Sequence, residues 1–287
     1  MGDAGIYRTL IDADALAILV ERGEVVLFDC RFDLADTEAG RAAYLAGHIP
    51  GAVYLHLDDD LSAPAGPRGR HPLPDRAAFA ARLAAYGLNA GQQVVAYDAA
   101  GGAYAARLWW MLRWVGHDAA AVLDGGLPAW TAAGRPLVRD VTAPSEGSFR
   151  AAPSLARAVE VDEVLNGIGG DMAVVDARAP HRFRGESDPL DPVSGRIPGA
   201  RNRFFRDNLD EAGRFKPGDV LAAEWSGVLA TTPAAQVVHQ CGSGVTATHN
   251  VLAMEVAGLF GSRLYPGSWS EWIADPSRPV ERGAADR

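Results

Sequence analysis

The most constraining feature of this chain of 287 residues is that its sequence pattern occurs twice. The motif Asp-x-Arg at 29–31 returns at 176–178, and Ile-Pro-Gly-Ala at 49–52 returns at 197–200. Corresponding positions in the two halves are between 142 and 148 residues apart. A solenoid would repeat a shorter unit at least three times, so the sequence predicts one domain that has been duplicated. The length agrees, because a typical domain holds about 100 to 200 residues.

Short apolar stretches alternate with helical periodicity in both halves of the chain. Helices are predicted at 79–86, 103–115 and 220–229. This alternation is typical of an α/β fold, so we expect two tandem domains, each with a mainly parallel central sheet flanked by helices. We place the first domain at 8–139 and the second at 153–284. They are joined by a linker at 140–152 that is rich in Ala, Pro, Ser and Gly.

Composition excludes several kinds of partner and location. The net charge of −9 disfavours binding to nucleic acid or to an anionic membrane. The N-terminus lacks the basic and apolar regions of a secretory signal, and the apolar runs are too short to span a bilayer. The only cysteines, Cys30 and Cys241, provide no disulfide framework. We therefore expect a cytoplasmic protein.

Cys241 stands where an apolar strand at 237–238 gives way to a helix predicted at 246–256. The intervening Gly-Ser-Gly at 242–244 permits a tight loop with inward-pointing backbone N–H groups. Such a nest at a helix N-terminus stabilises an anion, including a thiolate or a persulfide. The pattern therefore predicts a nucleophilic thiol. The alternative is that Cys241 is a small buried hydrophobic residue.

A glycine-rich loop between a strand and a helix can also hold a phosphate group. This loop lacks the lysine of a P-loop. Ala247 and Thr248 stand where a cysteine-dependent phosphatase has its arginine, and Gly242 and Ser243 leave the mouth of the loop without paired cations. The loop therefore indicates a substrate other than a phosphate ester.

The repeat assigns different roles to the two halves. Asp98 occupies the position in the first half that Cys241 occupies in the second. A carboxylate cannot act as a sulfur nucleophile, so the expected role of Asp98 is to cap the helix that begins near Ala103. In parallel α/β sheets, ligands bind beyond the carboxyl ends of the strands, where Cys241 would lie. We therefore expect a catalytic second half and an inactive first half.

Taken together, these motifs resemble the rhodanese family. They are the tandem Asp-x-Arg and Ile-Pro-Gly-Ala segments, a tryptophan near the end of each repeat at Trp130 and Trp272, and Cys-Gly-Ser-Gly-Val-Thr-Ala at 241–247. The resemblance covers nearly the whole chain. It implies that the Cys241 thiolate takes a sulfane sulfur from 3-mercaptopyruvate or thiosulfate, forms a persulfide, and passes the sulfur to a thiol or cyanide.

The resemblance also implies what the enzyme needs besides its donor. No metal or organic cofactor is expected. The expected partners are a small-molecule sulfur donor and a thiol acceptor, such as a reduced thioredoxin-like protein or a low-molecular-weight thiol. Nucleic acid and membrane are not expected as partners.

Further site residues are implied by the same resemblance. Family members place a serine, a histidine and an aspartate as a relay beside the cysteine, and these correspond to Ser243, His71 and Asp58. Without the resemblance, His71 and Asp58 look like residues of surface loops. The residues implied to bind the substrate within the loop are Gly242, Gly244, Val245, Thr246 and Ala247.

A donor with a carboxylate implies an arginine, because a planar guanidinium binds a carboxylate through two parallel hydrogen bonds. The resemblance points to Arg182, with Arg178, Arg184 and Arg196 as neighbouring alternatives. The loop resembles that of the family's mercaptopyruvate sulfurtransferases, whereas the segment 188–195 lacks the second arginine of the animal members. Because the loop offers no paired cations to a thiosulfate dianion, 3-mercaptopyruvate is the expected donor.

Three alternatives to that reading remain open. The first is a rhodanese that prefers thiosulfate. The second is a rhodanese-like module that binds without catalysis, which the intact cysteine loop disfavours. The third is a cysteine-dependent phosphatase or arsenate reductase, which the short loop and the missing arginine disfavour.

Overall fold

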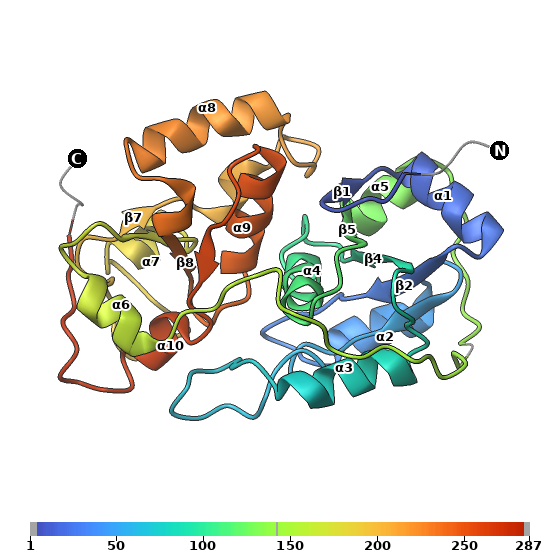
Figure 1. Cartoon of the computed structure of the whole chain (residues 1–287), viewed down its shortest axis with the longest axis horizontal. Coiled ribbons are helices and arrows are strands. Elements are labelled where there is room, and N and C mark those ends of the chain that lie inside the picture. Colours follow the sequence, from blue (N-terminus) through green and yellow to red (C-terminus); the bar gives the residue numbers. More distant parts are fainter. Residues whose placement is uncertain (1–4, 142, 284–287) are drawn as a thin grey trace. The chain divides into compact units, whose positions relative to one another are not determined.

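The computed structural model describes residues 5–141 and 143–283, which divide into two compact units (Figure 1). The first unit comprises the described residues up to Ser62 together with Pro74–Leu155 and Glu211–Phe215. The second comprises Ala63–Leu73, Ala156–Asp210 and the described residues from Lys216 onward. Each unit therefore includes one short segment that is distant in sequence from the rest of it.

Residues 63–73 belong to the second compact unit although the expected first domain, 8–139, includes them. The segment is hydrogen-bonded to the last helix of that unit, where the Arg70 N–H donates to Ser270 Oγ at 3.1 Å. His71 is part of the same segment. His71 therefore lies in the same compact unit as Cys241, although its place in the chain falls within the range expected for the first domain.

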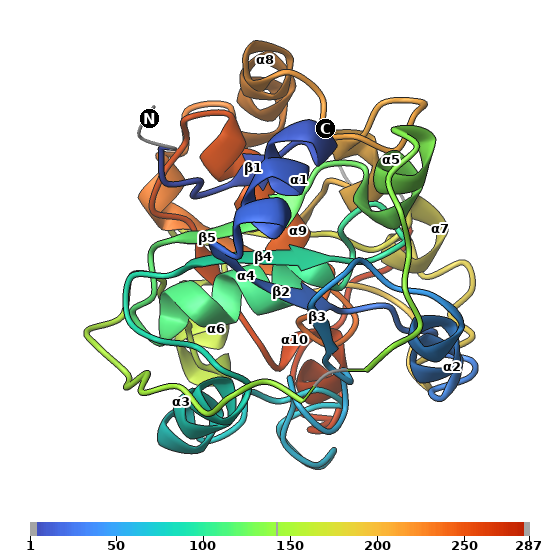
Figure 2. The same cartoon turned by 90° about the vertical axis from the view of Figure 1, so that its right-hand side faces the viewer.

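The first unit is built on a five-stranded sheet with strand order β1-β5-β4-β2-β3, which Figure 2 shows side by side with β1 uppermost. Its elements are β1 (Leu10–Ile11), α1 (Ala13–Arg22), β2 (Val25–Asp29), α2 (Ala39–Ala46), β3 (Ala52–Tyr54), α3 (Arg76–Ala85), β4 (Gln93–Tyr97), α4 (Ala105–Trp114), β5 (Ala120–Leu123) and α5 (Gly126–Ala132). Every strand pair in this sheet is parallel. The α/β fold expected from the alternating pattern is confirmed.

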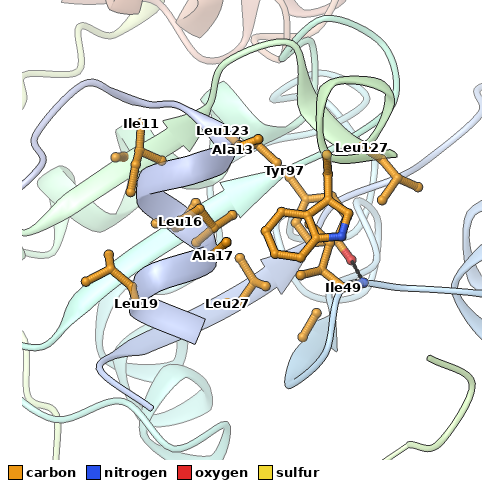
Figure 3. Packing of buried hydrophobic residues seen from close by; sticks show 14 of the residues in the cluster. Ile11, Ala13, Leu16, Ala17, Leu19, Leu27, Ile49, Tyr97, Leu123 and Leu127 are labelled. Carbon is orange, nitrogen blue, oxygen red and sulfur yellow. Dashed lines mark hydrogen bonds between the residues drawn. The ribbon is translucent and has the colours of Figure 1, made fainter. Parts of the chain in front are cut away.

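Helix α1 packs on this sheet through an apolar core (Figure 3). Its buried Leu16 and Leu19 join a cluster with Leu123 of β5. The helix begins after Asp12, whose carboxylate accepts the Ala15 N–H at 2.8 Å. Burial of this stripe of leucines holds the helix on the sheet, since each buried aliphatic side chain contributes about 1.5 to 3 kcal/mol.

The repeated Asp-x-Arg motif has a structural role in each unit. In the first unit, Arg31 Nη2 donates to Asp29 Oδ2 at 2.6 Å and to the Gly47 carbonyl at 2.8 Å. The second unit makes both contacts at 2.7 Å, with the corresponding residues Arg178, Asp176 and Gly195. The guanidinium ties the end of a strand to the glycine that lies two residues before the Ile-Pro-Gly-Ala segment. This contact explains why the two motifs recur together.

The second unit contains a four-stranded parallel sheet with strand order β7-β6-β8-β9. Its elements are α6 (Val161–Gly167), β6 (Ala173–Asp176), α7 (Pro180–Phe183), β7 (Arg201–Asn202), the 3-10 helix η1 (Phe205–Asn208), α8 (Gly218–Leu229), the 3-10 helix η2 (Ala234–Gln236), β8 (Val237–Gln240), α9 (Ala247–Val256), β9 (Arg263–Leu264) and α10 (Ser268–Trp272). Within the described residues, no helix is both long and apolar enough to cross a membrane.

Strand β8 is an inner strand of this sheet, and helix α9 follows it after six residues. Helix α9 contacts both β8 and α8 (Figure 1). Its side chains from Ala247 to Met254 are buried, so the helix is enclosed instead of lying on the surface. The short connection between β8 and α9 is therefore fixed at both ends.

Candidate functional site

Cys241 is the first residue after β8, at the carboxyl end of an inner parallel strand. Its side chain is buried, with 2% of the residue exposed. The Gly244 N–H donates to Cys241 Sγ at 3.2 Å. The expected strand–loop–helix arrangement around the thiol is present, and at least one backbone N–H of the loop points at the sulfur.

The loop is held by helix α10 as well as by its own ends. The Trp269 N–H donates to the Cys241 carbonyl at 3.0 Å, and the Ser270 N–H donates to the Gly242 carbonyl at 2.9 Å. Gly244 has φ +78°, and a Cβ there would lie 2.1 Å from the Pro266 carbonyl oxygen. Only glycine fits at that position, because a side chain would meet both backbone strain and a clash.

Ser268 is a site residue that the sequence analysis missed. Its hydroxyl accepts the Cys241 N–H at 3.1 Å and donates to the Tyr265 carbonyl at 2.9 Å. Its φ is +53°, which is strained for a residue with a side chain. The repeat pairs it with Gly126, whose φ is +58°. The sequence could have pointed to Ser268, because the repeat aligns this serine with a glycine in the other half of the chain.

His71 and Ser243 lie together in the second unit. Nδ1 of His71 is 2.7 Å from Ser243 Oγ, and both residues are buried. This is the geometry that the relay hypothesis requires for these two side chains. Asp58 belongs to the first unit, where its N–H lies 3.2 Å from His56 Nδ1 and burial raises the pKa of its carboxyl group. Its role as the third member of the relay stays a prediction.

The four candidate arginines have different surroundings. Arg178 is buried against Asp176, and although burial alone would lower its pKa, the neighbouring carboxylates raise it. Arg196 is buried and paired with Glu281. Arg184 is more exposed and paired with Glu186. These three arginines are paired with carboxylates outside the cysteine loop.

Arg182 lies next to the loop. A Cβ added to Gly242 would lie 3.3 Å from Arg182 Nη2. The guanidinium is held by two buried carboxylates, since Nε donates to Asp188 Oδ1 and Nη2 donates to Asp191 Oδ2, each at 2.9 Å. Arg182 is therefore the best placed of the four to meet a donor at Cys241.

Arg70 is a second cation at the loop, and it corrects an expectation. The same Cβ on Gly242 would lie 3.0 Å from Arg70 Nη2. Gly242 and Ser243 bring no positive charge, but Arg70 and Arg182 place two guanidiniums beside them. The expectation of a mouth without paired cations was wrong because the charges come from segments that are distant in the sequence.

The remaining loop residues differ in exposure. Val245 and Ala247 are buried, and Thr246 precedes the first turn of α9. Their roles in substrate binding, like those of Gly242 and Gly244, stay predictions. Among residues 5–141 and 143–283, no three His, Cys, Asp or Glu side chains group as they would to hold a metal ion.

Asp98 fills the corresponding loop of the first unit with its own carboxylate. Its Oδ1 accepts the N–H groups of Ala100 and Gly102 at 2.8 and 2.9 Å. Its Oδ2 accepts those of Tyr104 and Ala105 at 2.8 and 2.9 Å. The capping role expected for Asp98 is confirmed, and the nest that surrounds Cys241 in one unit holds a permanent anion in the other.

Comparison with known proteins agrees with this geometry. A family model described as Rhodanese-like domain matches residues 12–133 and again residues 160–275. The chain is 46% identical over 278 residues to the "Probable 3-mercaptopyruvate sulfurtransferase" of Pseudomonas aeruginosa, covering 96% of this chain and 98% of that protein. It is 32% identical over 294 residues to a thiosulfate sulfurtransferase of Bos taurus, covering 97% of each. The crystal structure of SseA from Escherichia coli, a 3-mercaptopyruvate sulfotransferase, is similar with a TM-score of 0.80 and 33% identity, covering 91% of this chain and 98% of that one.

Proposed function

The chain belongs to the rhodanese family and is a sulfurtransferase, and from that premise we propose that it moves a sulfane sulfur from 3-mercaptopyruvate to a thiol through a persulfide on Cys241. The observation that carries the choice of 3-mercaptopyruvate is the 2.7 Å contact between His71 Nδ1 and Ser243 Oγ, because the product of this donor needs a proton. The pair of guanidiniums, Arg70 and Arg182, lies beside the cysteine loop and suits an anionic donor of either kind. A cationic mouth next to a thiol suits an anionic sulfur donor. A neutral sulfur donor would gain no electrostatic stabilisation from these two cations.

The chemistry takes two steps with one sulfur atom in transit. The Cys241 thiolate attacks the donor's sulfur, the carbon–sulfur bond breaks, and its electron pair leaves with pyruvate as an enolate. The enzyme then holds a Cys241 persulfide, which the N–H groups of the loop stabilise as an anion. A thiolate acceptor attacks the outer sulfur, takes it as its own persulfide, and returns the Cys241 thiolate.

The enolate needs a proton, and we assign its delivery to the Ser243–His71 pair, whose contact of 2.7 Å supports this role. A histidine hydrogen-bonded to a serine can deliver a proton through the hydroxyl at neutral pH. Asp58 would orient the imidazole as a third member. Thiosulfate leaves as sulfite and needs no proton, so this relay would serve 3-mercaptopyruvate alone.

The test of the nucleophile is Cys241→Ser. We expect this variant to lose sulfur transfer with both donors and to keep its fold, because a hydroxyl cannot carry the transferred sulfur. Cys30→Ser is the matched control and should remain active. Treatment of the wild-type protein with the donor should add the mass of one sulfur atom to the Cys241 peptide, and cyanide should remove it. Turnover by Cys241→Ser would rule out the mechanism.

The test of the carboxylate contact is Arg182→Lys. A lysine keeps the positive charge beside Asp188 and Asp191 but loses the planar fork that matches a carboxylate. We expect KM for 3-mercaptopyruvate to rise about fivefold to tenfold, the effect of losing roughly 1 to 1.4 kcal/mol of hydrogen bonding, with little change for thiosulfate. Arg184→Lys, two residues away, is the control. No change with either donor would show that Arg182 supplies only charge, and equal changes for both donors would show that its contact is not specific to the carboxylate.

The acceptor is proposed on the basis of access. Cys241 is nearly enclosed, so a persulfide would present its outer sulfur and little else to solvent. A low-molecular-weight thiol, or a protein thiol on a narrow projection such as that of a reduced thioredoxin-like protein, could reach it. A comparison of turnover with small thiols and with a reduced thioredoxin would distinguish these acceptors.

A further inference from the structure

Arg70 and Arg182 are joined by a single carboxylate, that of Asp191. Arg182 Nη2 donates to Asp191 Oδ2 at 2.9 Å, and Arg70 Nη1 forms an ion pair with Asp191 Oδ1. The Asp191 side chain has no exposed surface, whereas 34% of the Arg70 side chain and 15% of the Arg182 side chain are exposed. A buried carboxylate thus lies behind two cations that reach the mouth of the site.

These three residues are the outer end of a row in which acids and bases alternate. Each inner guanidinium contacts two carboxylates, and only the last one, Arg70, contacts a single carboxylate. In order, the row is Asp176, Arg178, Asp188, Arg182, Asp191 and Arg70. Positive and negative charges balance in the buried part of the row. The least compensated charge is that of Arg70, the guanidinium most exposed to solvent.

We propose that Asp191 determines donor specificity, because its carboxylate limits the positive charge of the Arg70–Arg182 pair to suit a donor with one negative charge. The inference rests on the proposed function and names the feature that would select 3-mercaptopyruvate, with its single carboxylate, over the thiosulfate dianion. Coulomb energy scales with the charge of the ligand. A change of one unit in the site therefore alters dianion binding about twice as much as monoanion binding.

The first experiment compares kcat/KM for the two donors in Asp191→Asn. The amide keeps the shape of the side chain and removes its charge. We expect the ratio of thiosulfate to 3-mercaptopyruvate activity to rise about tenfold, the effect of one charge several ångströms away at an effective dielectric constant between that of a protein surface and that of water. High salt should reduce this change, since exposed charges are screened.

The second experiment changes the charge in the opposite direction. Arg70→Gln should lower kcat/KM for both donors and should lower it more for thiosulfate. The double variant Arg70→Gln with Asp191→Asn restores the net charge, so its ratio should return toward the wild-type value. Arg184→Gln is the control for loss of an arginine outside the row, and its ratio should not change.

The outcomes of these experiments test the charge-selection proposal separately from the proposed function. Equal losses for both donors in Asp191→Asn and in Arg70→Gln would overturn the charge-selection proposal and leave Asp191 a purely structural partner. If Asp191→Asn does not fold, Arg70→Gln decides alone, because Arg70 is partly exposed. The proposed function is judged separately, by the persulfide mass on Cys241 in the wild type. An unchanged ratio together with a normal persulfide would therefore reject only this inference.

Discussion

The two cysteines of the chain are both buried but have opposite electrostatic environments. Burial raises the pKa of the Cys30 thiol well above its ordinary value, and the nearby carboxylates of Asp29, Asp98 and Asp60 raise it further. Cys241 is equally enclosed, but it faces a backbone N–H and stands near two guanidiniums. The thiolate is the reactive form of cysteine, so the surroundings and not the residue type identify the nucleophile.

The proposed proton relay can be tested with single substitutions. His71→Ala and Ser243→Ala should each reduce turnover of 3-mercaptopyruvate by about 10²-fold or more, the usual contribution of general acid–base catalysis. Turnover of thiosulfate should change much less, because sulfite leaves without a proton. The measurement is kcat with each donor. Asp58→Asn should follow the same pattern more weakly if Asp58 orients the imidazole.

A different result would separate structure from catalysis. If His71→Ala leaves both activities intact, the contact between His71 and Ser243 only stabilises the loop. If both activities fall by the same factor, the variant has disturbed the thiol itself. Only a loss that is selective for 3-mercaptopyruvate supports proton delivery.

At the scale of elements, the loop after β8 depends on how α10 begins. Ser268 at the start of α10 accepts the Cys241 N–H in a left-handed conformation, whereas its counterpart Gly126 adopts the same φ without strain. Backbone strain of this kind costs about 1 to 3 kcal/mol. A strained serine beside the nucleophile indicates that its hydroxyl is needed there.

Ser268→Gly is therefore expected to separate stability from activity. Relief of strain should offset the loss of two hydrogen bonds, each contributing about 1 kcal/mol, so the free energy of unfolding should change by less than about 1 kcal/mol. Activity should fall about fivefold because the Cys241 backbone is less well fixed. Urea unfolding and kcat/KM with both donors would measure these effects. Unchanged activity would show that the hydroxyl is dispensable.

Elements with strong local signals were predictable from the sequence. Strand β8 and helix α9 follow from their apolar patterns, and the capping role of Asp98 follows from its place in the repeat. Arg70 and Asp191 could not be found in this way, because they meet only after segments distant in the chain have folded together. Periodicity reports the local environment of a residue. It carries no information about which exposed arginine will lie over which loop.

At the scale of the whole molecule, duplication has produced two versions of one loop. The first version contains its own anion, the Asp98 carboxylate, bound by four N–H groups. The second version holds Cys241, which is ionised or persulfidated only at certain stages of the proposed cycle. The first unit therefore shows which charge the nest is built to hold.

The stability of the molecule should depend on pH through His239. This histidine lies in β8, packed edge-on against Trp225, and burial lowers its pKa to about 3 from the usual 6.5. Between pH 6.5 and 3 the unfolded chain binds a proton that the folded chain excludes, so stability falls as the pH falls. The loss from this one group is about 1.4 kcal/mol per pH unit, or roughly 2 kcal/mol between pH 6.5 and 5.

The variant His239→Leu tests this assignment. Leucine fills the apolar site without a titratable group, so the loss of stability between pH 6.5 and 5 should shrink by about 2 kcal/mol relative to the wild type. Urea unfolding at the two pH values gives the comparison. His181→Leu, at an exposed position, is the control. An unchanged pH dependence in His239→Leu would mean that other groups cause it.

The burial of Cys241 also affects how the protein is inactivated by oxidation. The only other cysteine, Cys30, is itself buried, so neither can serve the other as a resolving thiol. A sulfenic acid on Cys241 would need an external thiol to rescue it before oxidation proceeded to the irreversible sulfinic form. A persulfide differs, because oxidation of its outer sulfur leaves a sulfur–sulfur bond that a reductant can cleave to regenerate the thiol. The bound sulfur would thus protect Cys241 from irreversible oxidation. Under oxidising conditions, enzyme stored as the Cys241 persulfide should keep its activity longer than enzyme stored with a free thiol.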